Sequence, residues 1–378
     1  MPALSSKVFS SHTADFQKQP RLDEIQKQSY DWMVAKGLHE LFKEISPVSD
    51  YTGKELDFFF DDYYFDDPKY TEEQARYKDT TYEAPLRAKL RLVNKRTKTE
   101  DRQEVYLGDF PIMTNRGTFI INGVERVVVS QLVRSPGVYF TASLWRGYKL
   151  FGAKVIPNRG AWLEFETDSA GVVAVKIDRN RKVPVTSLLR IFGLETDDAI
   201  RAAFSSPETG RFIEATLAKD AVHTVPDSYL EIYKRVRPGD LATAENAKNL
   251  IDGIFHREDR YDLSEVGRFK VNQRLAHSDT DSRLLVKEDL IAIIKEIIRL
   301  NIDQSGDGDD IDHLGNRRIR PIGELFQQRL RVGFARMRRV IQDRMSTSDI
   351  DTLTPAQLIN PRLLMAISKE FFSSSQLS

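Results

Sequence analysis

An acidic run late in the chain contains residues whose types could bind a metal ion. Residues 303–312 include five aspartates and no basic residue. A calcium loop that starts at Asp303 needs its closing bidentate glutamate at position 314, where the chain has Leu314. A two-metal cluster fails as well, because Ser305 interrupts the regular spacing of carboxylates. We therefore interpret the run as a solvated loop and expect no metal site.

The arginines that follow the acidic run could bind phosphate groups. Residues 317–344 contain nine arginines against two acidic residues. Arg317, Arg318 and Arg320 come directly after the run, and this placement favours a positioned, functional loop. The alternative is a solvated helix face that pairs with acids of the same chain, and the formal net charge of zero leaves both interpretations open.

Composition excludes several other kinds of site. The 378 residues include no cysteine, which rules out disulfides, thiolate metal sites and cysteine nucleophiles. The six histidines lack the spacing of a helical zinc site, and the chain has no phosphate-binding glycine loop or nucleophile elbow. Trp162 stands alone in an expected strand, so its residue type by itself indicates packing rather than a stacking platform. No stretch suits a signal peptide or a membrane span.

The elements that would position these residues are both helical and extended. Hydrophobic spacing predicts a helix over residues 22–45 with a break at Gly37, and alternation predicts a half-buried strand over 84–93. Two β-rich runs around Asn122-Gly123 predict a hairpin, because both central positions of a type I′ turn need positive φ. Further strands are expected over 149–188.

The second half of the chain is predicted to be mostly helical. Short helices are expected over 187–252, one of them capped at Thr196, and a longer helix over 288–302. A helix within 317–344 should bury one apolar face. That face carries Leu330, Phe334, Met337, Ile341 and Met345. The fold class is therefore α+β with more than one domain, and 40% hydrophobic with 30% charged residues suits a soluble globular protein.

Four segments resemble signatures of the bacterial RNA polymerase β subunit. They are residues 113–140 (MTNRGTFIINGVERVVVSQLVRSPGVYF), 267–275 (GRFKVNQRL), 309–325 (DDIDHLGNRRIRPIGEL) and 369–378 (KEFFSSSQLS). The last resembles the start of the rifamycin-resistance region. The segments occur in the family's order, and the resemblance covers nearly the whole chain. Motifs of this length in a fixed order make chance agreement negligible.

The resemblance implies a mixed, multidomain α+β architecture in which one domain is inserted into another. Residues 1–20 would be a flexible N-terminus, residues 21–132 together with 326–370 the protrusion, and residues 133–325 the inserted lobe. Residues 371–378 would begin the fork and rifamycin region. Together these parts would form one side of the cleft that holds downstream DNA and the RNA–DNA hybrid.

DNA-binding residues are also implied by the resemblance. Trp162, Asp312 and Arg317 match a core recognition pocket that captures an unstacked base of the nontemplate strand. An indole can stack on such a base, and a carboxylate with a guanidinium can recognise a guanine edge. The further DNA-binding candidates are Arg268, which matches a lobe arginine near the same strand, Arg318 and Arg320.

A rifamycin pocket is implied by the hairpin together with the last residues of the chain. Its members here would be Arg126, Val129, Ser375, Gln376, Leu377 and Ser378. The family usually has glycine where this chain has Ser373. Serine adopts positive φ less readily than glycine, so the resemblance leaves the local backbone open at this position.

The function implied by the resemblance is DNA-templated RNA synthesis, as part of DNA-directed RNA polymerase, a nucleotidyltransferase. This part would position DNA and the hybrid, would supply no catalytic residue and would be inactive alone. It would bind no cofactor, since the catalytic magnesium belongs to the β′ subunit in this family. The expected partners are DNA, the RNA–DNA hybrid, β′, the α dimer, ω, a σ factor and the remaining β sequence, all in the cytoplasm.

Two other functions are left open by the sequence. The chain could be a truncated, non-catalytic module that binds σ or regulatory proteins. It could also be an independent metal-dependent enzyme built on residues 303–313, although the failed calcium spacing argues against this. Because the protrusion of the family packs on later sequence, we expect exposed apolar surface near residues 362–378.

Overall fold

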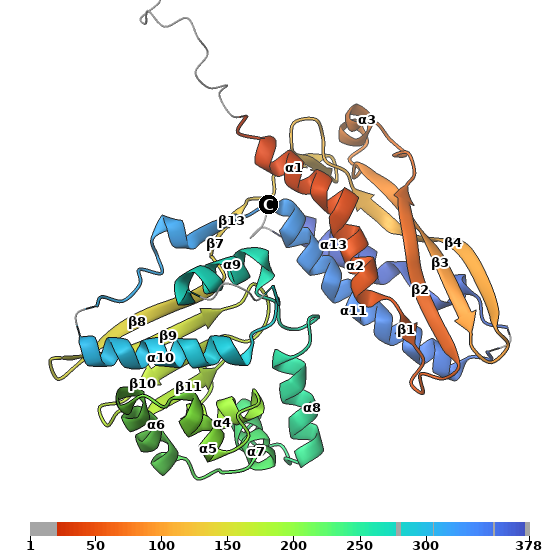
Figure 1. Ribbon diagram of the computed structural model, residues 1–378. Coiled ribbons are helices and arrows are strands. Elements are labelled where there is room, and N and C mark those ends of the chain that lie inside the picture. The colour runs from red at the N-terminus through yellow and green to blue at the C-terminus, as the bar shows by residue number, and fades with distance from the viewer. Residues whose placement is uncertain (1–20, 277–280, 305, 351, 375–378) are drawn as a thin grey trace, which may run out of the picture. The chain divides into compact units, whose positions relative to one another are not determined.

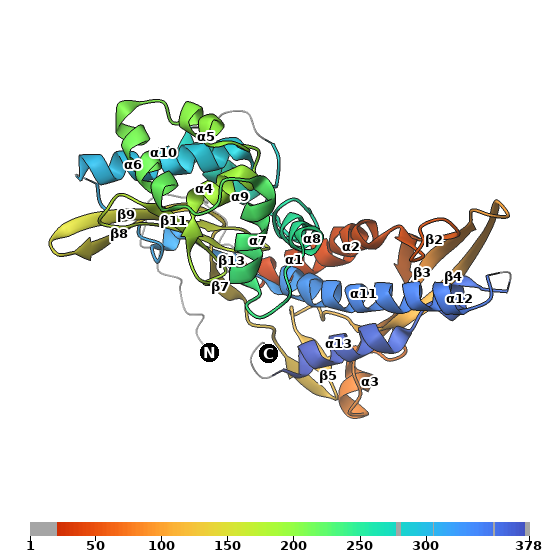
Figure 2. The same ribbon diagram turned by 90° about the horizontal axis from the view of Figure 1, so that it is seen from below.

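The computed structural model describes residues 21–276, 281–304, 306–350 and 352–374 (Figures 1 and 2). The chain divides into two compact units. Unit 1 combines Met1–Gln131 with Ile319–Ser378, and unit 2 is Leu132–Arg318. The second boundary lies before helix α11 (Ile322–Thr347). The family resemblance implied a boundary between residues 325 and 326, which would fall inside that helix.

A four-stranded antiparallel sheet forms one layer of unit 1. Its order is β1 (Val48–Ser49), β2 (Leu56–Phe65), β3 (Glu83–Asn94) and β4 (Thr99–Pro111). The predicted half-buried strand is confirmed in β3, because its alternate apolar residues are at most 5% exposed. These residues are Leu86, Ala88, Leu90 and Leu92. They join the hydrophobic core that the sheet shares with the helices of this unit.

Helices supply the rest of the unit 1 core. Near the N-terminus, α1 (Glu24–Trp32) and α2 (Leu38–Ile45) are joined by a π-helical segment (Met33–Gly37). The predicted helix is therefore confirmed, and the break at Gly37 is a widened turn rather than an interruption. The remaining helices of this unit in the described chain are α3 (Glu72–Tyr77), α11, α12 (Pro355–Leu358) and α13 (Pro361–Ser373).

Helix α11 has the buried face that the sequence predicts. Leu330, Phe334, Met337, Ile341 and Met345 are all buried. The helix packs against α1, α2 and α13, as Figures 1 and 2 show.

A glycine allows the close approach of α11 to α1. A Cβ atom at Gly323 would lie 2.0 Å from the carbonyl oxygen of Ser29, and the Gly323 amide donates to Ser29 Oγ over 2.9 Å. Only a residue without a side chain fits at this helix crossing.

Helix α13 contradicts the expectation of exposed apolar surface near residues 362–378. Ile367, Phe371 and Phe372 are at most 6% exposed. The Phe372 ring lies 4.6 Å from Phe119 and 5.2 Å from Phe326. The expectation is therefore wrong for residues 362–374, because α13 finds its apolar partners within unit 1. Residues 375–378 lie outside the described residues.

The Asn122-Gly123 hairpin is confirmed. Strands β5 (Phe119–Ile121) and β6 (Val124–Arg126) pair in antiparallel register around it. Asn122 has φ of 49° and Gly123 has φ of 78°, which are the positive values that a type I′ turn requires.

A five-stranded antiparallel sheet organises unit 2. Its order is β12 (Val183–Pro184), β11 (Val173–Ile177), β10 (Leu163–Thr167), β9 (Tyr148–Ile156) and β8 (Gly137–Trp145). The strands expected over 149–188 are thus confirmed. Helix α10 (Lys287–Asp303) packs on β9 and crosses the sheet in Figure 1, in agreement with the long helix expected over 288–302.

The short helices predicted over 187–252 are also present. They are α4 (Val185–Ile191), α5 (Asp197–Ala203), α6 (Pro207–Lys219), α7 (Val225–Val236) and α8 (Ala244–Phe255). Helix α9 (Ser264–Leu275) follows them and was not predicted. Thr196 caps α5 as predicted, since its hydroxyl accepts a hydrogen bond from the Ala199 amide. In the described part of the chain, no helix is long and apolar enough to cross a membrane.

Two short strands frame the region that carries the candidate site. Strand β7 (Gln131–Arg134) pairs with β13 (Arg317–Arg320) in a two-stranded sheet. A short 3-10 helix (Leu314–Asn316) leads into β13, and the Asn316 carbonyl accepts a 2.9 Å hydrogen bond from the Ser135 amide. The end of the acidic run is therefore held beside β7.

Candidate nucleic-acid-binding site

Trp162 lies immediately before β10, half-buried, at a turn fixed by backbone hydrogen bonds. Its amide donates to Asp178 Oδ1 over 2.8 Å, and its carbonyl accepts from the Asp178 amide over 3.0 Å. The Arg179 guanidinium lies 5.9 Å from the indole centroid. Asp178 and Arg179 both have positive φ, so the basic turn after β11 bends back toward the indole. Trp162 is thus a partly exposed aromatic ring beside a cation.

The loop before Trp162 is anchored to another part of unit 2. Arg159 and Asp262 exchange backbone hydrogen bonds of 3.0 and 2.8 Å. Gly160 has φ of 119°, and a Cβ atom there would lie 2.8 Å from the Tyr261 ring. Only glycine permits this approach, so the Arg159-Gly160 sequence before Trp162 has a direct structural reason.

Asp312 and Arg317 meet as an exposed ion pair. Arg317 Nη2 donates to Asp312 Oδ1 over 2.7 Å, and Arg134 Nη2 lies 3.6 Å from the same oxygen. The hydrogen bond from Arg317 lowers the pKa of the Asp312 carboxyl below its ordinary value, and the charge of Arg134 adds to this. The side chain of Asp312 remains 65% exposed, so its second oxygen can be reached by a ligand.

Arg318 links the two halves of the candidate site. Its Nη2 donates to Asn158 Oδ1 over 2.7 Å, which ties β13 to the loop that leads to Trp162. Arg317, which pairs with Asp312, is the first residue of β13, and the next residue, Arg318, holds the loop that leads to Trp162. The structure brings Asp312 and Arg317 into contact and connects the Trp162 segment to them through this bond.

The acidic run is held by contacts within unit 2, and it forms no metal site in the described residues. Asp309 Oδ2 accepts from the Phe140 amide over 2.7 Å, and Lys149 Nζ donates to Asp307 Oδ1 over 2.7 Å. The bond from Lys149 lowers the pKa of Asp307. These carboxylates fasten the loop to the β8–β9 hairpin, which is a structural role for a run that sequence suggested to be merely solvated.

Two of the other DNA-binding candidates occupy different surroundings. Arg268 is 4% exposed, and its guanidinium donates to Asp289 over 2.9 Å and to the carbonyls of Ser282 and Leu284. The expectation that Arg268 contacts DNA is corrected on this point, because a buried guanidinium with its donors occupied cannot reach a phosphate. Arg320 belongs to unit 1 and pairs with Glu324 over 3.3 Å.

The residues of the expected rifamycin pocket are described only in part. Arg126 Nη1 lies 3.4 Å from the Phe372 carbonyl oxygen, to which it donates, and Val129 is 61% exposed. Ser375, Gln376, Leu377 and Ser378 lie outside the described residues. Ser373 is the last residue of α13 and is not among the residues with positive φ, so this structure does not demand a glycine there.

Sequence reasoning missed Arg134. It lies in β7, near the start of unit 2, whereas Asp312 lies near the end of that unit in the sequence. The pairing of β7 with β13 brings the two side chains together. Residue types close to Arg134 in the sequence give no sign of this contact. The Asp312 carboxylate thus has two guanidinium neighbours rather than the one expected.

Comparisons with known proteins agree with this architecture. Residues 134–320 match the family model described as RNA polymerase Rpb2, domain 2. The chain is 49% identical to the DNA-directed RNA polymerase subunit beta of Syntrophomonas wolfei over 95% of its length. The corresponding proteins of Synechocystis sp. and Gloeobacter violaceus are 47% and 46% identical over the same share. The chain belongs to the bacterial RNA polymerase β-subunit family.

The family assignment concerns one part of these relatives. The chain spans 32% of the length of each, and it corresponds to their N-terminal portion. The matched domain 2, residues 134–320, nearly coincides with unit 2, which carries Trp162, Asp312 and Arg317. Unit 2 is therefore the lobe of this β-subunit segment, and the α+β fold expected from the sequence is confirmed.

Proposed function

We propose that this chain acts as part of a DNA-directed RNA polymerase, in which it positions DNA and the RNA–DNA hybrid and contributes no catalytic residue. The observation that carries the proposal is the identity of 46–49% with polymerase β subunits over 95% of the chain. The other parts of the enzyme would be the remaining β sequence, β′, the α dimer, ω and a σ factor. Magnesium would be held by β′, and this chain alone would be inactive.

Within this role, we assign base recognition to Trp162, Asp312 and Arg317. A base that has left the stack could lie on the half-exposed indole, where stacking contributes about 1–3 kcal/mol. Guanine offers acceptors at O6 and N7 to a guanidinium and N–H donors to a carboxylate. Asp312 and Arg317 present a carboxylate and a guanidinium side by side, with Arg317 Nη2 2.7 Å from Asp312 Oδ1. The lowered pKa of Asp312 keeps its carboxylate ionised and able to accept.

Neighbouring arginines support the pair rather than recognise a base. Arg134 adds positive charge beside Asp312, and Arg318 holds the Trp162 loop through Asn158. Phosphate contacts from such residues would set the register of the strand, while the base pocket would add sequence preference. Arg126 and Val129 remain proposed members of a rifamycin pocket that residues 375–378 would complete.

Reconstitution tests the proposal. The chain is mixed with the remaining β sequence, β′, α, ω and σ, and promoter-dependent RNA synthesis is measured. We expect RNA product that requires this chain, and altered pausing at guanine-dependent positions in Trp162→Ala. Trp145→Ala is the matched control, since Trp145 is a 43% exposed tryptophan of the same unit that lies in another strand. An assembled complex without RNA product would contradict the polymerase role.

A further inference from the structure

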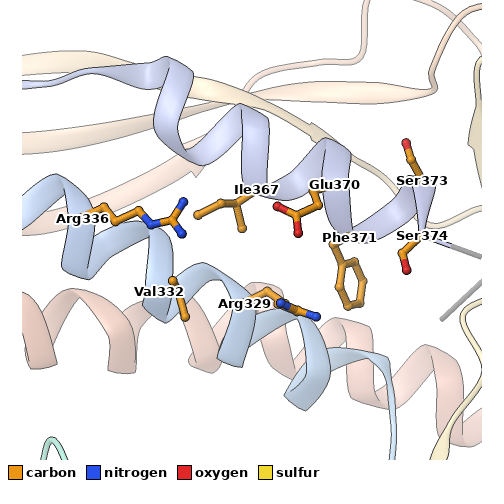
Figure 3. Close-up of a pocket in the computed structure, with 8 residues that line it drawn as sticks. All are labelled: Arg329, Val332, Arg336, Ile367, Glu370, Phe371, Ser373 and Ser374. Carbon is orange, nitrogen blue, oxygen red and sulfur yellow. The ribbon is translucent and has the colours of Figure 1, made fainter. Parts of the chain in front are cut away.

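A pocket of about 360 Å³ lies between α11 and α13 of unit 1 (Figure 3). The two helices approach closely at Gly333, where a Cβ atom would lie 2.9 Å from the Leu364 side chain and 3.0 Å from that of Ile367. This approach fixes their spacing. The volume falls in the range of pockets that hold a small ligand or a few side chains of a partner.

The floor of the pocket is apolar. Val332 is 47% exposed, and Ile367 and Phe371 contribute mostly buried side chains to the wall. An apolar group that covered this floor would remove it from water and gain roughly 25 cal/mol per Å² of buried apolar surface. A ligand made only of charged groups would leave this gain unused.

Two arginines of α11 line the pocket. Arg329 and Arg336 are both exposed, and neither forms an ion pair or a side-chain hydrogen bond with another described residue. They are separated by two turns on one helix face, which places their Cα atoms about 10 Å apart. Arg331 of the same helix differs, because Glu44 accepts its hydrogen bond over 2.8 Å. The chain thus supplies a carboxylate to Arg331 and leaves Arg329 and Arg336 available.

Glu370 of α13 adds an acceptor to the same pocket. Figure 3 shows its side chain directed toward α11, on the side that carries Arg329 and Arg336. Within the described ranges, Glu370 is exposed and forms no ion pair or side-chain hydrogen bond. The wall therefore presents two groups that bind anions, one group that accepts N–H donors and an apolar floor between them.

We propose that this pocket docks an acidic segment of a partner protein. Carboxylates of the segment would pair with Arg329 and Arg336, an apolar side chain would cover Val332, and a backbone N–H would donate to Glu370. Side chains on one side of an extended segment recur about every 7 Å, so two carboxylates can reach both arginines. An apolar centre with a polar rim is the usual composition of a protein interface.

A nucleic-acid backbone fits the same pocket less well. Its phosphates would meet the arginines, but a phosphodiester backbone has no N–H group to donate to the Glu370 carboxylate. A phosphodiester backbone has no apolar side group for the floor formed by Val332, Ile367 and Phe371. The proposal is independent of the base pocket at Trp162, which belongs to the other unit.

Fluorescence anisotropy of the full chain tests the proposal. The probe is a short fluorescein-labelled peptide of repeated Glu-Leu units, and its Lys-Leu counterpart and an oligothymidylate are compared with it. We expect binding of the acidic peptide alone, weakened about threefold to tenfold in Arg329→Gln and in Arg336→Gln. Arg339→Gln is the matched control, because Arg339 is exposed on the same helix but does not line the pocket.

Val332→Ser separates a peptide from a phosphate ligand. Loss of the exposed apolar side chain should weaken the acidic peptide, whose leucine covers it, but should leave a purely anionic ligand unchanged. The proposal is overturned if the acidic peptide does not bind, if its affinity is the same in Arg329→Gln and Arg336→Gln as in Arg339→Gln, or if only oligothymidylate binds and Val332→Ser leaves it unchanged. Denaturation curves of the exposed-site variants verify that each is folded.

Discussion

Arg268 and Arg317 lie in the same unit and both donate to an aspartate, but their surroundings differ. The Arg268–Asp289 pair has side chains that are 5% and 1% exposed, whereas those of Arg317 and Asp312 are 32% and 65% exposed. A buried pair must stay closed, because opening it leaves an unpaired charge in a medium of low dielectric constant. An exposed pair can open toward water or toward a ligand. Burial therefore separates a structural arginine from one that can bind.

The largest difference between the two pairs should appear when the carboxylate is removed. Asp289→Ala leaves Arg268 charged and buried, so we expect a loss of about 3–5 kcal/mol in the free energy of unfolding. Asp312→Ala should leave the urea midpoint nearly unchanged, since water solvates Arg317. Urea denaturation followed by circular dichroism measures both. A folded Asp289→Ala variant of near-normal stability would show that Arg268 is accessible after all.

A second comparison concerns pH. Asp197 accepts a 2.6 Å hydrogen bond from Arg190, whose side chain is fully buried. Burial alone would raise the pKa of Asp197, but Arg190 outweighs it and lowers the pKa. A lowered pKa in the folded state stabilises the fold above the ordinary pKa of about 3.9, and this contribution is lost as the pH falls below it.

Asp197→Asn should therefore lower the free energy of unfolding by about 1–2 kcal/mol at pH 7. The difference from the unsubstituted chain should shrink as the pH falls below about 3.9 and through the lowered pKa of the folded state, where the carboxyl takes up a proton. Asp312→Asn should show a change of the same sign but smaller size, because its pair is exposed to water. Urea titrations at several pH values measure both. If the free energy of unfolding changed with pH by the same amount in the two variants, burial would not distinguish the two ion pairs.

The features that the sequence predicted correctly depend on residues close together in the chain. The Asn122-Gly123 turn, the alternation in β3 and the apolar face of α11 each follow from spacing within one element. Trp162 was different, because its residue type alone indicated packing, and only the family resemblance suggested a pocket. Local patterns thus determine elements, but they do not determine which elements meet.

The contacts that the sequence did not predict join residues from separate elements. Arg268 lies 21 positions before Asp289 and was expected to contact DNA, although the packing of α9 and α10 buries it. Arg134 meets Asp312 only because β7 pairs with β13. The expected exposure of Phe372 was wrong for the same reason, since its partner Phe119 lies in a distant hairpin.

The smallest effect on stability is expected from a substitution in the acidic run. It tests whether an exposed ion pair there only holds the loop or also binds a metal. Asp307 pairs with Lys149 while its own side chain is 92% exposed. Asp307→Ala should leave the urea midpoint unchanged, because water and salt screen such a pair. Calorimetric titration of the chain with magnesium or calcium should give no stoichiometric binding, since the residue that would close a calcium loop is Leu314. Tight binding that Asp307→Ala abolishes would instead make this run a metal site and would place a second functional region beside the β8–β9 hairpin.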